Sequence, residues 1–180
     1  MIGTHVGYTG GKKENPTYRA LGDHAESIEI IYDPSVVSYQ DLLEVFWKSH
    51  DPGSPPWSRQ YMSAIFYHNE EQKKLAVRSK EEEETRTGRK IYTEITPAAE
   101  FYRAEDYHQK YYLRHRPELV KELQLIYPEE TFVDSTAAAR INGFLGGEES
   151  YTTLQSDLGA LLSPEEKERL LNGLGGKARF

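Results

Sequence analysis

The residue best suited to chemistry is Glu26, in the segment AESIEIIY at residues 25–32. Three isoleucines and a tyrosine in this segment predict a strand. Alternation along a strand places Glu26 on the same face as Ile28 and Ile30. Because an ionised carboxyl is costly on an apolar face, we expect Glu26 to stay protonated and to serve as a general acid. The alternative is that Glu26 lies at the strand end and reaches water.

Two tyrosines could act with this carboxyl. Tyr18 follows Asn15-Pro16-Thr17 in a predicted loop over residues 9–24, and Tyr61 begins a predicted strand over 61–67, after a Pro-rich loop at 51–60. Phenol hydroxyls beside a protonated carboxyl could bind a polar oxygen on an otherwise apolar substrate. Taken singly, each tyrosine is equally explained as a packing residue.

Three histidines lie near acids in the sequence, and a His/carboxylate metal site is one interpretation. They are His24, His50 and His108, with Glu26, Asp51, Glu105 and Asp106 close by. No HExxH or similar spacing occurs, and each histidine is explained as a hydrogen-bonding group of a loop or helix end. The segment Gly7-Tyr8-Thr9-Gly10-Gly11 is not a nucleotide-binding motif either. We therefore expect neither a metal nor another cofactor.

Composition excludes several further classes of chemistry. The 180 residues contain no cysteine, so they hold no disulfide, thiolate metal site or thiol nucleophile. The formal net charge of −7 argues against nucleic-acid binding. No apolar run approaches the ~20 residues of a membrane-spanning helix, and no signal peptide is evident. We expect a cytoplasmic protein, with a mitochondrial location possible if a targeting segment precedes Met1.

Strands and helices alternate through the first part of the chain. Strands are predicted at 2–8, 25–32, 61–67 and 91–95. Helices are predicted from Ser38, with Asp41 completing a capping box, and from Asn69, with Gln72 at the matching position and Gly88 as the stop. A short helix is predicted at 104–113.

The remainder is helix and loop. Pro117 is predicted to start a helix, and glycines end helical patterns in Asn142–Gly147 and Asn172–Gly176. The order predicts an α+β fold, a ferredoxin-like two-layer sandwich with a mixed sheet. The predicted domains are 1–113 and a helical C-terminal extension, 114–180.

Seven segments, taken in order, resemble one family, peptide methionine sulfoxide reductase A. They are VGYTGG at 6–11, NPTY at 15–18, GDHAE at 22–26, YDP at 32–34, VFW with HDP at 45–52, QYMSAI at 60–65 and AEDYHQ at 104–109. This family reduces the S-epimer of methionine sulfoxide. Each segment alone is weak, but seven in this order are specific.

The resemblance implies roles for individual residues. A cysteine thiolate attacks the sulfoxide sulfur, a glutamate matching Glu26 protonates the oxygen, and tyrosines matching Tyr18 and Tyr61 hold that oxygen. The cysteine becomes a sulfenic acid, which is reduced through a disulfide, usually by thioredoxin. Trp57, His50, Asp106 and His108 are further candidates for the substrate pocket. The implied substrates are oxidised-methionine proteins or free methionine sulfoxide, and the implied state is a monomer.

The departures from the family pattern concern the nucleophile above all. In the family it lies in a Gly-Cys-Phe-Trp motif upstream of the VGYTGG segment, and this sequence does not contain that motif. Ser54-Pro55-Pro56-Trp57 stands where the family often has Gly-Asn-Asp, so Trp57 could add an apolar contact. We expect an incomplete reductase that is inert as these 180 residues. The alternative is a pseudoenzyme that binds oxidised methionine without reducing it.

Overall fold

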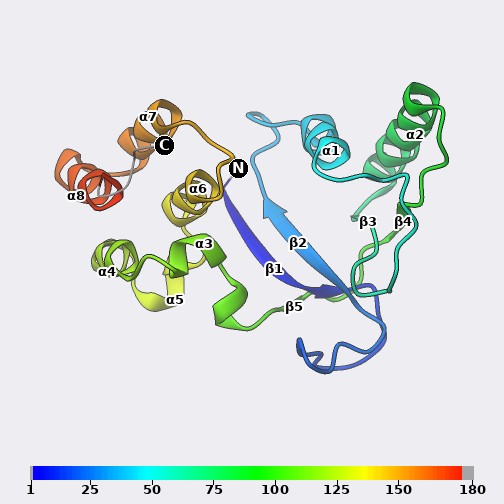
Figure 1. The fold of residues 1–180 in the computed structure, drawn as a ribbon, viewed down its shortest axis with the longest axis horizontal. Coiled ribbons are helices and arrows are strands. Elements are labelled where there is room, and N and C mark those ends of the chain that lie inside the picture. The colour runs from blue at the N-terminus through cyan, green and yellow to red at the C-terminus, as the bar shows by residue number, and fades with distance from the viewer. Residues whose placement is uncertain (1, 176–180) are drawn as a thin grey trace. The chain divides into compact units, whose positions relative to one another are not determined.

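The computed structural model describes residues 2–175, and the chain divides into two compact units. One unit is Val6–Ala104, and the other joins residues 1–5 to residues 105–180. Figure 1 labels the elements of both. Apart from the first residues of the strand Gly3–Thr9, the strands lie in Val6–Ala104, and helices make up almost all of the other unit, which is the α+β composition that we predicted. The predicted domain boundary at residue 113 stays a prediction.

Within the described residues, five strands form two small sheets. In the first, β1 (Gly3–Thr9) lies between β2 (Ala25–Ile31) and β5 (Tyr102–Arg103), and β1 pairs antiparallel with β5. In the second, β3 (Ala64–Tyr67) pairs in parallel with β4 (Glu94–Pro97). Both pairing directions therefore occur, but in separate sheets rather than in the one mixed sheet that we predicted.

Two helices cover the β3–β4 pair. Helix α1 (Tyr39–Lys48) begins with the capping box of Ser38 and Asp41, as predicted, and α2 (Glu70–Thr87) begins at Asn69 and ends at Gly88, whose φ is 65°. The Asn69 side chain accepts a hydrogen bond from the backbone N–H of Gln72, but the Gln72 side chain accepts one from the backbone N–H of His68. The reciprocal bond expected at Asn69 is thus shifted by one residue.

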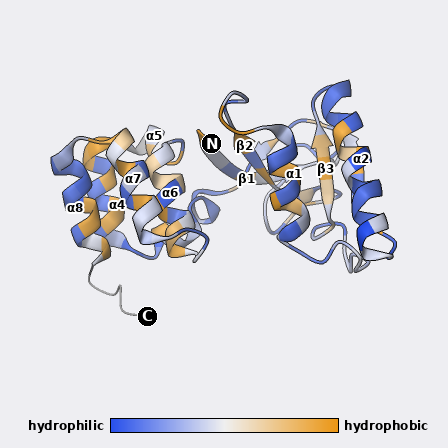
Figure 2. Cartoon of the chain, turned by 90° about the horizontal axis from the view of Figure 1, so that it is seen from above, coloured by the Kyte–Doolittle hydropathy of each residue, from blue (hydrophilic) through white to orange (hydrophobic). Residues whose placement is uncertain are grey.

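The core of this region is formed where α1 and α2 meet the strands. The buried residues are Leu43 and Trp47 of α1, Ile65 of β3, Ala76 of α2 and Ile91 of the segment before β4. Figure 2 shows why α2 contributes little to it, because most of that helix is hydrophilic.

Two strands differ from their predicted ranges. β3 begins at Ala64, not at residue 61, because a turn in which Met62 N–H bonds the Arg59 carbonyl precedes it. β4 covers 94–97 rather than 91–95. Before it, Tyr92 N–H bonds the Pro52 carbonyl and the Thr93 carbonyl accepts from Lys80 Nζ at 2.7 Å. The backbone at Tyr92 and Thr93 therefore forms hydrogen bonds with a loop and with a side chain, so it does not pair with β3.

The second unit is a helical bundle with its own core. Its elements are the 3-10 helix η1 (Asp106–His108), α3 (Tyr111–Arg114), α4 (Pro117–Ile126), α5 (Glu129–Phe132), α6 (Thr136–Leu145), α7 (Tyr151–Leu161) and α8 (Pro164–Leu174). Leucines that are 0% exposed fill its interior: Leu113, Leu119, Leu123, Leu154, Leu158 and Leu170. Figure 2 shows the matching hydrophobic stripes on α4 and α8.

Some helix ends in this unit agree with the predicted ones and others differ. The predicted helix at 104–113 is two short elements, because Lys110 between them adopts φ 53° and donates to the Thr4 carbonyl at 2.6 Å. Pro117 starts α4 as predicted. Gly147, with φ 86°, follows the end of α6, whereas Asn142 and Gly143 lie inside that helix. Gly176 of the second predicted ending lies outside the described residues.

Candidate functional site

The loop that carries Tyr18 is held in place by the two residues before β2. His24 is 1% exposed; its Nδ1 accepts from Gly11 N–H at 3.2 Å and its Nε2–H donates to the Lys13 carbonyl at 2.8 Å. Asp23 accepts from the amides of Lys12 and Lys13, and these bonds lower its pKa. The two contacts of His24 fix a neutral imidazole protonated on Nε2. His24 is therefore a structural residue of the loop.

Arg59 joins this loop to the loop that carries Tyr61. Its Nε donates to the Asp23 carbonyl at 3.2 Å and its NH2 group to the Gly10 carbonyl at 3.3 Å. Its NH1 group lies 3.4 Å from Glu94 Oε2. Gly10 has φ 81°, a left-handed conformation that costs glycine little. One guanidinium thus holds both ends of the 10–24 loop against the 51–63 loop.

These constraints bring Tyr18, Glu26 and Tyr61 together. The Tyr61 hydroxyl is hydrogen-bonded to the Tyr18 side chain, and this bond is the main cause that raises the pKa of Tyr61. Burial and the nearby charge of Glu26 raise it further. A bond that favours the protonated phenol is one in which Tyr61 donates. Tyr61 therefore keeps its proton and can donate it to an oxygen.

Gln60 is the centre of the same cluster. Its Nε2 lies 2.5 Å from Glu26 Oε1 and 3.2 Å from the Tyr61 hydroxyl. The backbone carbonyl of Gln60 accepts a hydrogen bond from the backbone N–H of Glu26 at 3.0 Å. The Gln60 side chain therefore links the Glu26 carboxyl to the Tyr61 hydroxyl.

The expected burial of Glu26 on an apolar face is wrong. Glu26 is exposed, and Ile28 on the same face of β2 is 59% exposed. The face is apolar but open, so Glu26 reaches its partners at the rim of a cavity. The interpretation in which this carboxyl reaches water is the one that the structure supports.

The cavity beside Glu26 has a volume of about 500 Å³. Residues of β2, α1 and β3 line it, and its apolar walls include Ile28, Ile30, Leu42, Phe46, Ile65 and Phe66. Glu26, His50 and Tyr61 all contribute to the lining, whereas Tyr18 and Trp57 lie outside it. A group that is apolar with one polar oxygen suits such a site, since the walls bury its carbon atoms while the rim binds the oxygen.

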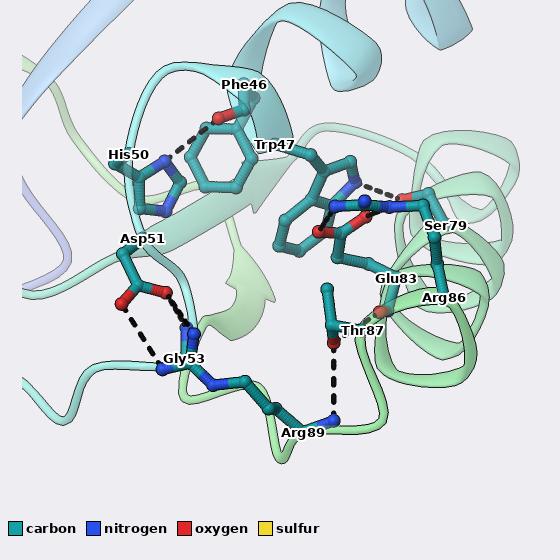
Figure 3. A network of polar contacts seen from close by, with 10 residues as sticks. All are labelled: Phe46, Trp47, His50, Asp51, Gly53, Ser79, Glu83, Arg86, Thr87 and Arg89. Carbon is teal, nitrogen blue, oxygen red and sulfur yellow. Dashed lines mark hydrogen bonds and ion pairs between the residues drawn. The ribbon is translucent and has the colours of Figure 1, made fainter.

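His50 is fixed at this cavity from two sides. Its Nδ1–H donates to the Phe46 carbonyl at 2.9 Å, a bond drawn in Figure 3. Its Nε2 lies 2.8 Å from Ser63 Oγ, which lies 2.8 Å from Thr93 Oγ1. The first bond assigns a proton to Nδ1, and the second directs Nε2 at Ser63.

The residue after His50 anchors the Pro-rich loop. Asp51 pairs with Arg89 through two contacts of 3.2 Å, and it accepts from Gly53 N–H and Ser54 Oγ, as Figure 3 shows for Arg89 and Gly53. The bond from Ser54, followed by that from Arg89, holds the pKa of Asp51 below its usual value. Asp51 is therefore a structural anion of this loop.

A family model described as peptide methionine sulfoxide reductase matches residues 1–141. The chain belongs to this family. A peptide methionine sulfoxide reductase of Drosophila melanogaster is 46% identical over 149 residues, which are 82% of this chain and 60% of that protein. The peptide methionine sulfoxide reductase MsrA of Methanosarcina acetivorans is 52% identical over 123 residues, 62% of this chain and 65% of the relative.

A solved structure supports the same assignment. The crystal structure of Mxr1 from Saccharomyces cerevisiae in reduced form has a TM-score of 0.58 and 32% identity, and the match covers 64% of this chain and 71% of that one. The chain spans about 60% of the length of the curated relatives from Drosophila and Methanosarcina. The resemblance of the seven sequence segments to this family is confirmed.

The remaining candidates for the substrate pocket do not lie together in the structure. Trp57 is 81% exposed and stacks on Tyr61 with ring centroids 4.7 Å apart, so it belongs to the edge of the cluster. Asp106 and His108 lie in η1 of the helical unit, outside the unit that holds Glu26. Their roles in a reductase pocket stay predictions, as do those of Glu26, Tyr18, Tyr61 and His50.

Two residues of this cluster, Arg59 and Gln60, were not predicted from the sequence. Gln60 stands in the QYMSAI segment, where only its neighbour Tyr61 was considered, and Arg59 precedes it. Their one signal is adjacency to Tyr61. Within residues 2–175, no three His, Asp or Glu side chains gather as metal ligands, and no helix has the length and apolarity to cross a membrane.

Proposed function

We propose that this chain supplies the sulfoxide-binding part of a peptide-methionine (S)-S-oxide reductase. The observation that carries this proposal is the contact of Glu26, Gln60 and Tyr61 at the rim of an apolar cavity. The cavity would take the methionine side chain, Tyr61 and Tyr18 would hold the sulfoxide oxygen, and Glu26 would give it a proton. Trp57 would pack on the substrate beside Tyr61, and His50 would line the cavity.

The reduction itself needs a thiol, and these 180 residues contain none. We propose that the polypeptide as given binds methionine sulfoxide and does not reduce it. The thioredoxin partner and the ferredoxin-like arrangement of the sandwich are further parts of this proposal, and both rest on family membership. Protein-bound and free methionine sulfoxide are the proposed substrates.

Calorimetry with an N-acetyl, N-methylamide derivative of methionine sulfoxide tests the binding. We expect the S-epimer to bind, the R-epimer and methionine to bind more weakly, and Glu26→Ala to abolish the preference for the sulfoxide. A folded chain that does not distinguish sulfoxide from methionine would contradict the proposal. Reduction of the sulfoxide with dithiothreitol, above a heat-denatured control, would contradict the proposed lack of turnover.

A second candidate is a pseudoenzyme that recognises oxidised methionine and never reduces it. The absence of cysteine from these 180 residues favours it. The coding sequence upstream of Met1 distinguishes the two: an in-frame Gly-Cys-Phe-Trp supports the reductase, and its absence supports the binding module.

A further inference from the structure

The side chain of Gln60 contacts both groups to which the proposed chemistry assigns a proton. Its Nε2 carries two hydrogens, and it lies within hydrogen-bond distance of two acceptors, Glu26 Oε1 at 2.5 Å and the Tyr61 hydroxyl at 3.2 Å. Both acceptors belong to neighbouring segments, β2 and the loop before β3. A single amide group therefore fixes the relative orientation of the carboxyl and the phenol.

We propose that Gln60 is a positioning residue that sets which oxygen of Glu26 carries the acidic proton and where Tyr61 directs its own. This inference rests on the proposed binding of methionine sulfoxide. It concerns a side chain to which the sequence assigned no role.

The Gln60 amide can act on Glu26 only as a hydrogen-bond donor. Oε1 accepts from the Gln60 amide, so a proton on Glu26 belongs on Oε2, because an O–H facing an N–H would oppose donor to donor. Of the two oxygens, Oε2 is then the one that can protonate a sulfoxide. Without Gln60 the carboxyl could rotate, and either oxygen could carry the proton.

The same amide group contacts the Tyr61 hydroxyl. Its oxygen accepts from Gln60 and its O–H donates to Tyr18. A donor that is itself accepting a hydrogen bond is polarised and donates more strongly. A sulfoxide oxygen that enters the rim can replace Tyr18 as the acceptor from Tyr61. Gln60 would therefore strengthen the bond that holds the substrate.

The backbone contact between the two segments is separate from the side chain. Glu26 N–H donates to the Gln60 carbonyl at 3.0 Å, and a substitution at residue 60 leaves this bond in place. Gln60→Leu therefore removes the amide group while keeping the approximate size and the backbone pairing. A matched control is Gln40→Leu, since Gln40 is an exposed residue of α1.

The first experiment needs no ligand. Nuclear magnetic resonance of the folded chain measures the exchange of the Gln60 side-chain amide protons. We expect slow exchange that becomes fast in Glu26→Ala, while the backbone spectrum of the variant stays native. A Gln60 amide that exchanges fast in the unsubstituted chain, or that is unaffected by Glu26→Ala, would overturn the inference whether or not sulfoxide binds.

The second experiment compares ligands by calorimetry. We expect Gln60→Leu to weaken binding of the S-sulfoxide about three- to tenfold, the usual effect of one hydrogen bond, and to leave methionine binding unchanged. In a Glu26→Ala background most of this effect should vanish, because the carboxyl that Gln60 orients is gone. Equal weakening for sulfoxide and methionine would indicate a structural role and overturn the inference. Sulfoxide binding that is absent from the unsubstituted chain would contradict the proposed function and leave the amide exchange to decide the role of Gln60.

Discussion

The Tyr61 hydroxyl donates a hydrogen bond to Tyr18, which lies on a separate loop, and this bond raises the pKa of Tyr61. Tyr18→Phe removes the acceptor, so the pKa of Tyr61 should fall toward the ordinary tyrosine value of 10.0. Carbon-13 resonances of labelled tyrosine rings measure it, with the Tyr61 signal assigned by its loss in Tyr61→Phe. An unchanged titration would show that burial and Glu26, rather than Tyr18, raise the pKa.

The same bond makes the stability depend on alkaline pH. Because the folded chain holds the Tyr61 proton more tightly than the unfolded chain, the stabilisation is complete below pH 10 and is lost as the pH rises through the raised value. Urea midpoints measured between pH 8 and 11 should therefore fall more steeply for the unsubstituted chain than for Tyr18→Phe. Parallel curves would contradict this linkage.

Arg59 should control the mobility of the loop that bears Tyr18. Arg59→Met keeps an unbranched apolar stem but removes the donors to the Gly10 and Asp23 carbonyls. We expect faster amide hydrogen exchange across residues 11–22 and weaker sulfoxide binding, because Tyr18 is no longer held beside Tyr61. Arg19→Met is the matched control, since Arg19 is exposed on the same loop and the charge change is equal. Equal exchange in both variants would refute the role of Arg59.

His24 should contribute stability rather than chemistry. His24→Leu leaves the Gly11 N–H and the Lys13 carbonyl without their partner, and a buried group that loses its bond costs about 1–3 kcal/mol. Urea unfolding followed by tryptophan fluorescence measures it, because both tryptophans, Trp47 and Trp57, lie in the unit Val6–Ala104. The exposed His68 provides the control, and His68→Leu should change stability little. A similar loss in both variants would show that the effect is not specific to the loop.

The acid limb of the stability curve should depend on Glu83 in α2. Its side chain is 9% exposed, and Arg86 donates two hydrogen bonds to it, which lower the pKa of Glu83 below 4.5 (Figure 3). A lowered value gives stability that is present above pH 4.5 and is lost as the pH falls through the folded-state pKa. Glu83→Gln should therefore flatten urea midpoints measured between pH 3 and 6. Glu82→Gln, at an exposed neighbour, should not; if it flattens them equally, overall charge is responsible.

Local signals in the sequence were sufficient for the helix ends. Ser38 with Asp41, Asn69 and Gly88 act through bonds to residues within one turn, so their types and spacing predict the structure directly. The range of β4 was predicted wrongly because a contact between distant residues decides it. Its start is decided by the bond of Tyr92 N–H to the Pro52 carbonyl, which no local pattern encodes.

The site shows the same division. The chemistry of Tyr18, Glu26 and Tyr61 made them candidates, but only the family resemblance predicted that they act together, because Tyr61 lies 35 residues after Glu26 in the chain. Arg59 and Gln60, which hold those segments in contact, have no distinguishing pattern in the sequence. Their roles depend on which carbonyl and carboxyl oxygens the fold brings near them, and only the structure contains that information.

The helical unit offers a matched pair of leucines on α4. Leu123 is 0% exposed and Leu125 is 73% exposed. Leu123→Ala leaves a cavity in the bundle and should cost about 2–5 kcal/mol, whereas Leu125→Ala should cost less than about 0.5 kcal/mol. Circular dichroism at 222 nm follows both units, and tryptophan fluorescence follows only Val6–Ala104. If the two units unfold independently, Leu123→Ala lowers the circular dichroism midpoint and leaves the fluorescence midpoint unchanged; a shared shift in both signals would show that they unfold as one cooperative structure.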